Sequence, residues 1–220
     1  MLWIGTNGGG LNKFDLKKET FTQYKHDPNN PQSLSIDRIL SIYADKSGIL
    51  WVGTYGGGLN RFDRERERFL CFREKDGLPN DVVYGILEDS KGNLWVSTNN
   101  GLSKFNLKKG TFRNYDIHDG LQSNEFNSGA YHKNKNGEMF FGGINGLNSF
   151  HPNDIRDNLY APPVVVTDFQ IYNRSIPVGE GPEGITYLKK SITETDEIKL
   201  SYKNRVLSFQ FAALHYASPE

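Results

Sequence analysis

The sequence contains a single cysteine, Cys71, among its 220 residues. One cysteine excludes an internal disulfide framework and any zinc cluster built from several cysteines. The sequence also lacks a long apolar run and a basic-then-apolar start, so neither a membrane-spanning helix nor a signal peptide is expected in it. Lys plus Arg and Asp plus Glu both number 26, which gives a net charge of zero. A neutral chain has no global field that draws it to nucleic acid or to an acidic membrane.

Aromatic residues make up 13% of the chain, and glycine occurs 23 times. This composition favours strands joined by tight turns over helices. The sequence is therefore expected to be all-β.

A stretch of ten residues occurs twice, as WIGTNGGGLN at 3–12 and as WVGTYGGGLN at 51–60. Related copies begin with LWVST at 94–98 and with MFFGG at 139–143, and a Gly-Leu-x-x-Phe element follows each copy. The three tryptophans of the repeat lie 48 and 44 residues apart. A period in the forties with short strands and glycine turns is typical of a β-propeller with one repeat per four-stranded blade.

Four strands, A to D, are expected in each repeat. Strand A precedes an Asp-x-x-Gly or Asn-x-x-Gly turn, strand B carries the Trp, strand C is the Gly-Leu-x-x-Phe element, and strand D carries alternating aromatics. Strand A is predicted at 39–44, 82–88 and 126–132. The first copy lacks strand A and the fourth lacks strand D, so fourteen strands, or about 3.5 blades, are expected. The chain is therefore interpreted as a piece of a closed propeller, or as one that associates to cover its open faces.

The predicted domains follow from this repeat. A partial β-propeller is expected over 1–157, with blades near 1–38, 39–81, 82–125 and 126–151. A proline-containing linker is expected over 158–163. The N-terminal part of an incomplete, Ig-like β-sandwich is expected over 164–220, with strands at 164–172, 197–202 and 205–214 and a loop at 179–184.

The repeated aromatic residues are interpreted as packing between blades rather than as a sugar-stacking surface, because each lies at a fixed position between apolar neighbours. These structural positions are Trp3, Trp51, Trp95, Phe14, Phe62, Phe105 and Phe150. The glycine clusters lead into another strand, and no Gly-Lys-Ser/Thr follows them, so they predict a hairpin turn rather than a nucleotide site.

The loops that follow strands B and D are expected on one face of the propeller. Amide, carboxylate and aromatic groups there suit sugar hydroxyls, although Asn and Asp are also ordinary turn formers. The candidate ligand-binding residues are Asn7, Tyr55, Asn99, Asn100, Asn145, Asp81 and Glu125. The turns on the opposite face carry many Lys and Arg residues and are expected to form a solvated rim or to contact a partner.

Catalysis is the rival interpretation of the same face. Asp81 and Glu125 occupy nearly equivalent positions in adjacent repeats, and His118 is close to Glu125 in sequence. Repeat register alone explains the carboxylate pair, so no catalytic residue is assigned. The histidines lack metal-binding spacing, and Asp45 and Asp89 are expected to cap their own turns. Neither a metal nor a cofactor is therefore expected.

The motif LWVGT-x-GGGLN-x-FD, followed by Asp-Gly-Leu segments at 76–78 and 119–121, resembles two-component regulator propeller repeats. The segment from Pro162 onward, PPVVVTDFQIYNRSIPVG, resembles the start of the three-Y domain that follows such propellers. The resemblance implies the periplasmic sensor region of a hybrid histidine kinase of the Bacteroidetes type. It also implies an oligosaccharide ligand, an inner-membrane anchor, and a kinase outside this chain.

The expected function is therefore non-catalytic ligand sensing, most simply of a glycan-derived ligand. A polysaccharide lyase or hydrolase of the propeller type and a scaffold that binds only protein are the alternatives. The expected partners are an oligosaccharide and either the remaining blades or a second copy. Nucleic acid is not expected, and the membrane is expected only through segments outside this chain.

Overall fold

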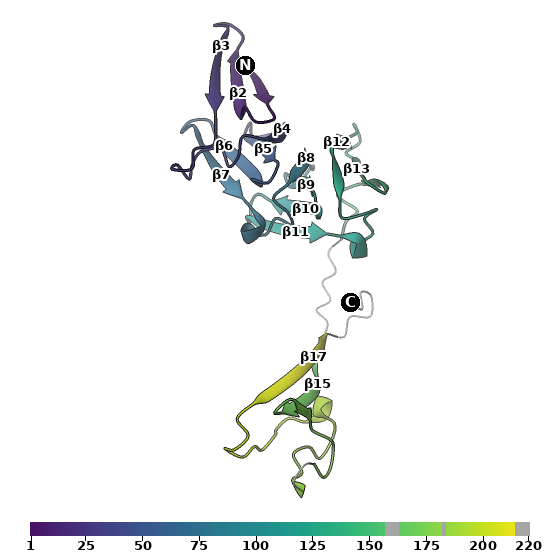
Figure 1. The fold of residues 1–220 in the computed structure, drawn as a ribbon. Coiled ribbons are helices and arrows are strands. Elements are labelled where there is room, and N and C mark those ends of the chain that lie inside the picture. Colours follow the sequence, from purple (N-terminus) through teal and green to yellow (C-terminus); the bar gives the residue numbers. More distant parts are fainter. Residues whose placement is uncertain (157–162, 182–183, 214–220) are drawn as a thin grey trace. The chain divides into compact units, whose positions relative to one another are not determined.

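The chain folds into antiparallel sheets in a computed structural model that describes residues 1–156, 163–181 and 184–213. It divides into two compact units, Met1–Arg156 and Asp157–Glu220, and Figure 1 shows the strands of both. In the described ranges no helix is long and apolar enough to cross a membrane. The expectation of an all-β fold is confirmed.

The first unit contains four sheets that follow one another in chain order (Figure 1). Within each sheet, consecutive strands pair in antiparallel fashion. Their strands are β1 (Leu2–Gly5), β2 (Leu11–Asp15) and β3 (Thr20–Tyr24); β4 (Ile39–Ala44), β5 (Leu50–Thr54), β6 (Leu59–Asp63) and β7 (Arg68–Phe72); β8 (Val83–Glu88), β9 (Leu94–Thr98), β10 (Gly101–Asn106) and β11 (Thr111–Tyr115); and β12 (Phe126–Lys133), β13 (Met139–Gly143) and β14 (Gly146–Phe150). The predicted strands A to D are thus found in order, and the first and fourth sheets have three strands each in the described part of the chain.

The A strands β4, β8 and β12 contact one another across the sheets. Each pairs with its B strand through a register shift near its start, between Ile39 and Ser41, between Val83 and Gly85, and between Phe126 and Tyr131. Such irregularities bend a strand and increase its twist. The same bend therefore recurs in three successive sheets on the strands that adjoin one another.

The A–B turns are capped by the side chain that begins each of them. Asp45 Oδ1 accepts the amides of Ser47 and Ile49 at 2.9 Å each, and Asp89 Oδ1 accepts those of Lys91 and Asn93. The second carboxylate oxygen of each Asp accepts an indole N–H from strand B, at 2.9 Å from Trp51 to Asp45 and at 3.3 Å from Trp95 to Asp89. The expectation that these aspartates cap their own turns is confirmed.

The fourth sheet has Asn134 in place of the turn aspartate and Phe140 in place of the tryptophan. Asn134 Oδ1 accepts the amides of Asn136 and Glu138, so the turn is capped in the same way. A phenyl ring has no N–H to satisfy, so this repeat does not require a second carboxylate oxygen.

The sheets pack face to face through the repeated aromatics, as the sequence predicts. Trp3 lies 5.4 Å from Phe62 in the next sheet, and Trp95 lies 4.8 Å from Phe150, between ring centroids. Trp51 and Trp95 are only 2% and 1% exposed. Trp3 is half-buried. The assignment of these residues to packing between sheets is thus consistent with their positions.

The outward face of the first sheet is not covered by the described residues. Phe14 stacks on Phe21 with centroids 4.5 Å apart, as Phe62 and Phe69 do at 4.7 Å in the second sheet. Yet Phe21 is 63% exposed, whereas Phe69 is 5% exposed. The difference arises because Phe69 packs against the first sheet, and Phe21 has no preceding sheet in this chain.

The glycine clusters form the turns between strands B and C. The amides of Gly56 and Gly58 both donate to the carbonyl oxygen of Asp81, which precedes β8 of the next sheet. Gly58 has a φ of +76°, and a Cβ there would collide with the carbonyl oxygen of Phe72. The amides that a phosphate loop would offer are therefore occupied by the neighbouring sheet.

The second unit contains one described sheet with the order β16-β15-β17, formed by β15 (Val164–Ile171), β16 (Arg174–Ser175) and β17 (Leu207–Ala213). Phe169, Ile171, Ile176 and Leu188 form its buried cluster. The strands predicted at 164–172 and 205–214 correspond to β15 and β17, with Leu214 outside the described residues. The predicted linker, apart from Pro163, also lies outside them. A sandwich stays a prediction.

The strand predicted over 197–202 is wrong, because these residues are not in a strand and pair with none among the described residues. One edge of β15 is paired with β17 along its length, and the other is paired with β16 at Gln170 and Ile171. The segment instead ends in a turn, in which the Asn204 amide donates to the carbonyl oxygen of Ser201 and Asn204 Oδ1 accepts the Ser201 amide. Ile198 packs on the buried cluster while Tyr202 is 84% exposed, so the alternation reflects burial of one side chain without strand pairing.

Candidate functional site

The candidate site lies where strands B end and strands A begin. The backbone joins these points across neighbouring sheets, because Asn7 forms a bridge with Arg38 and Tyr55 forms one with Val82. The Asn99 amide donates to the carbonyl oxygen of Val82. The predicted residues Asn7, Tyr55 and Asn99 therefore lie at the same strand ends in three successive sheets.

Arg38 connects the first two of these residues. Its Nε donates to Asn7 Oδ1 at 3.0 Å, and its guanidinium carbon lies 4.0 Å from the ring centroid of Tyr55. A guanidinium over a phenol ring is held by the electrostatic attraction of the ring face. Asn7, Arg38 and Tyr55 are all exposed, so they form a continuous polar and aromatic surface.

Tyr84 and Asn99 form the next part of the same surface. The hydroxyl of Tyr84 donates to Asn99 Oδ1 at 2.9 Å. Burial raises the pKa of Tyr84, and the charges of Glu125 and Tyr55 raise it further. The Tyr84 hydroxyl therefore stays protonated at neutral pH and can donate a hydrogen bond. We call the set Asn7, Arg38, Tyr55, Tyr84, Asn99 and Glu125 the mouth row.

Two predicted residues, Asn100 and Asn145, lie near the mouth row but have roles in turns. The Asn100 amide donates to Thr98 Oγ1, and its side chain reaches the carbonyl oxygen of Pro79 at 3.4 Å. The Asn145 amide donates to Gln122 Oε1 at 2.7 Å, and its neighbour Ile144 takes the position that Asn99 occupies in the third sheet. These contacts fit the alternative in which Asn residues form turns.

Asp81 is held inside its own loop. Its Oδ1 accepts the Glu74 amide at 2.9 Å, as Asn124 Oδ1 accepts that of Ile117 in the next repeat. The structural counterpart of Asp81 is therefore Asn124, and Glu125 lies one position further along. The two carboxylates are thus offset by one residue in the repeat. His118 is exposed, and its amide donates to Asp116 Oδ1.

Sequence reasoning missed Arg38 and Tyr84. Arg38 lies immediately before β4 and is the counterpart of Val82 and Glu125, so aligning the starts of the A strands would have found it. Tyr84 lies at the start of β8, where the register shift occurs.

The mouth row offers amide groups, two phenols, and one guanidinium and one carboxylate of opposite charge at one set of strand ends. Amides and phenols both donate and accept hydrogen bonds, and Tyr55 is 43% exposed and presents a ring. Among residues 1–156, 163–181 and 184–213, no group of three or more His, Cys, Asp or Glu residues is placed to hold a metal ion. The arrangement suits a neutral polyhydroxylated ligand.

Comparisons with known proteins agree with this fold. The family model for the two-component regulator propeller matches residues 33–56 and 77–100. Histidine kinase P4 of Formosa agariphila is 42% identical over 139 residues, which are 63% of this chain and 10% of that protein. The chain therefore spans about a tenth of the length of this kinase.

Solved structures show the same similarity. A crystal structure described as the extracellular domain of the hybrid two-component system BT3049 from B. thetaiotaomicron is 31% identical, with a TM-score of 0.73 over 99% of this chain and 28% of that one. The corresponding domain of BT4673 from the same organism has a TM-score of 0.50 at 22% identity, over 98% of this chain and 28% of that one, and shows the fold alone. The fold is thus a propeller-type array of β-sheets. Two of the repeats that build it match the two-component regulator propeller model.

Proposed function

We propose that this chain is a non-catalytic part of the sensor region of a two-component histidine kinase, and that its ligand is derived from a glycan. The propeller repeats and the similarity to a histidine kinase and to an extracellular two-component domain support the sensor role. In this proposal the parent protein is anchored in the inner membrane, the described units lie in the periplasm, and the kinase lies outside this chain.

The mouth row is the observation that carries the ligand class. Arg38 contacts both Asn7 and Tyr55, and Tyr84 donates to Asn99, so the polar groups are held in place before a ligand binds. A site with fixed donors and acceptors loses less entropy on binding. Hydroxyl groups of a sugar match such donors and acceptors, and the Tyr55 ring offers a face for the sugar ring.

The test is a calorimetric titration of the purified chain with neutral oligosaccharides from several polysaccharides. One of them is expected to bind, and Tyr55→Ala or Asn99→Ala is expected to weaken that binding by about 10-fold or more, the equivalent of one lost hydrogen bond or ring contact. Tyr202→Ala, which alters a residue that is 84% exposed in the second unit, is the matched control. Binding that survives both mouth variants would contradict the proposed site. Release of reducing or unsaturated ends from a polysaccharide would instead favour the alternative function, a polysaccharide hydrolase or lyase.

We also propose that further blades, or a second copy, cover the outward faces of the first and fourth sheets. Phe21 at 63% exposed and Leu147 at 61% exposed support this proposal, because such apolar surface is costly in water. Sedimentation analysis of the isolated chain is expected to show self-association that Phe21→Gln reduces. If the chain stays monomeric at all concentrations, a second copy does not cover these faces. Coverage by further blades then remains the explanation.

A further inference from the structure

A cavity of about 650 Å³ lies along β7, away from the mouth row. One wall comes from the connection between β3 and β4, where the Phe69 amide donates to the carbonyl oxygen of Gln32 at 2.7 Å. The other walls come from β6, β7 and the residues that follow β7. Because β7 is the outermost strand of its sheet, packing of another sheet against either end of the array would not cover this edge.

The cavity is strongly cationic within a chain of zero net charge. Its lining contains five positive side chains, which are Arg61, Arg66, Arg68, Arg73 and Lys75. The negative side chains in the lining are Asp27 and Asp63. With His26 neutral, the lining therefore carries three net positive charges, which favours an anionic ligand.

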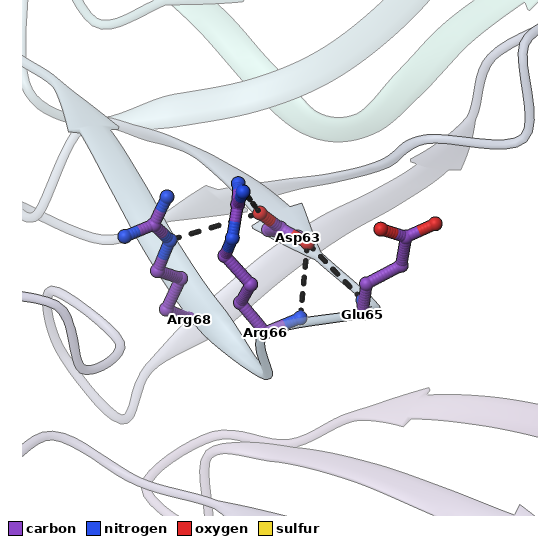
Figure 2. Close-up of polar contacts among 4 residues, drawn as sticks. All are labelled: Asp63, Glu65, Arg66 and Arg68. Atoms are coloured by element: carbon purple, nitrogen blue, oxygen red, sulfur yellow. Dashed lines mark hydrogen bonds and ion pairs between the residues drawn. The ribbon is translucent and has the colours of Figure 1, made fainter.

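The acidic side chains leave the guanidinium groups available. Asp63 Oδ2 lies 3.4 Å from an Arg66 nitrogen and 3.6 Å from Arg68 Nε (Figure 2). These side chains are 66% and 42% exposed, so the pairs contribute little stability and can be exchanged for a ligand. In the described residues Arg61 makes no ion pair. Glu65 contributes its backbone amide to Asp63, and it is not part of the lining.

The loop wall is preformed by its own hydrogen bonds. The Asp27 amide donates to Ser33 Oγ at 2.9 Å, Asp27 Oδ1 accepts the Asn29 amide, and Asn30 Oδ1 accepts the Gln32 amide. A wall that is already ordered costs less entropy on binding. The lining also includes Leu70, which is 54% exposed and can pack on an apolar ring face.

We propose that this cavity binds a small anionic saccharide whose sulfate or carboxylate groups are held by the arginines of β6 and β7. Guanidinium groups bind both kinds of oxyanion through paired hydrogen bonds. The volume lies within the roughly 300–1,000 Å³ of small-molecule sites. The saccharide part of this ligand rests on the proposed sensing function, whereas its charge rests on the arginines alone.

The first experiment is a calorimetric titration of the purified chain with four probes at low and at physiological salt. The probes are a sulfated trisaccharide, a uronic acid trisaccharide, a neutral trisaccharide and inorganic sulfate. At least one anionic trisaccharide is expected to bind more tightly than the neutral one and inorganic sulfate, with an affinity that falls as salt rises. The probe that binds best distinguishes sulfate esters from carboxylates.

The second experiment uses variants of the lining whose fold is checked by their melting temperatures. Arg61→Gln combined with Arg73→Gln is expected to weaken binding by about 10-fold or more, since bonds to charged groups are the stronger ones. Arg113→Gln, on the outer strand β11 of the next sheet, is the matched control and should leave the affinity unchanged. Asp63→Asn is expected to tighten binding several-fold because it frees Arg66 and Arg68. The turn tolerates Asn, since Asn106 Oδ1 accepts the amides of Lys108 and Lys109 at the same position in the third sheet.

The proposal is overturned if no anionic probe binds, or if both the double variant and Asp63→Asn leave the affinity unchanged. Inorganic sulfate that binds as tightly as the trisaccharides would overturn the saccharide part. If a neutral sugar binds in a way that depends on Tyr55 and Asn99 and no anionic probe binds, the proposed sensing function stands. Only the proposal for this cavity is then rejected.

Discussion

The indole of Trp51 meets the ring of Phe105 in the next sheet almost edge-on, with centroids 5.9 Å apart and an angle of 85° between the planes. Both side chains are 2% exposed and belong to one buried cluster. The same pairing occurs between Trp3 and Phe62 and between Trp95 and Phe150. Each repeat is therefore stabilised by the one that follows it.

Replacement of Trp51 tests this interface. Trp51→Ala removes the largest side chain of the cluster and is expected to lower the free energy of unfolding by roughly 3–5 kcal/mol. Ile117→Ala, at a residue that is 51% exposed, is the control and should change it by less than about 0.5 kcal/mol. Chemical denaturation measures both. A melting temperature unchanged in Trp51→Ala, together with lost ligand binding, would contradict the structural assignment.

The Asp45–Trp51 hydrogen bond can be isolated by a double-mutant cycle. Asp45→Asn keeps the Oδ1 cap but places an amide N–H opposite the indole N–H, and it is expected to cost about 1–3 kcal/mol. In a Trp51→Phe background the indole donor is gone, so the same change should cost about 1 kcal/mol less. Denaturant midpoints of the four proteins provide the coupling energy. Strict additivity would show that the hydrogen bond contributes nothing.

Two glycines with the same sign of φ should respond differently to alanine. At Gly58 (φ +76°) a Cβ collides with the backbone of Phe72, whereas at Gly48 (φ +79°) no atom lies within 4 Å of it. Gly48→Ala is expected to cost about 1–2 kcal/mol, the strain of a left-handed residue. Gly58→Ala should cost clearly more, because the carbonyl of the neighbouring strand must also shift. Equal losses of unfolding free energy in the two variants would mean that the close approach of the Phe72 carbonyl oxygen to Gly58 is not important.

Alkaline pH should destabilise the fold through partly buried tyrosines. Burial, followed by the nearby Glu88 carboxylate, raises the pKa of Tyr43 from 10.0 to about 12. The folded state thus favours the neutral phenol, so this contribution is fully present below about pH 10 and is lost as pH rises through the folded pKa. Tyr43→Phe should show a shallower fall in unfolding free energy between about pH 10 and about pH 12. Tyr24, whose pKa is also raised to about 12, accounts for part of the remaining slope, and an identical fall in the variant would refute the role of Tyr43.

The repeated strands could be predicted because the pattern occurs four times in one chain. The strand predicted over 39–44 is β4 (Ile39–Ala44), and the one predicted over 126–132 differs from β12 by one residue. Turn caps such as Asp45 were predictable because their hydrogen bonds are local. The segment 197–202 lacked such an internal comparison, and its alternation alone did not indicate whether a pairing partner existed.

The candidate site was less accessible to sequence reasoning. Asn7, Tyr55 and Asn99 follow strand B and share a repeat position, so alignment found them. Arg38 and Tyr84 act through neighbours that are 31 and 15 residues away, Asn7 and Asn99 respectively. Tyr84 and Asn99 meet within one sheet, through the pairing of β8 with β9. Arg38 and Asn7 meet where two adjacent sheets adjoin, which no single repeat specifies. The cationic cavity was hidden for the same reason, because its walls come from a loop of one repeat and the outer strand of the next.

Most residues that line the cavity lie outside the buried clusters that hold the sheets together, and Leu34 and Phe69 belong to both. Arg61 and Leu70 are exposed, and the loop at 25–38 makes its bonds mainly within itself, whereas the Trp–Phe pairs lie on the buried faces. The connection between β3 and β4 at 25–38 is also longer than its counterparts at 73–82 and 116–125. In a chain built this way, the length or the charge of one connection between sheets can change without disturbing the core. Recognition can therefore diverge quickly between relatives while thermal stability stays constant.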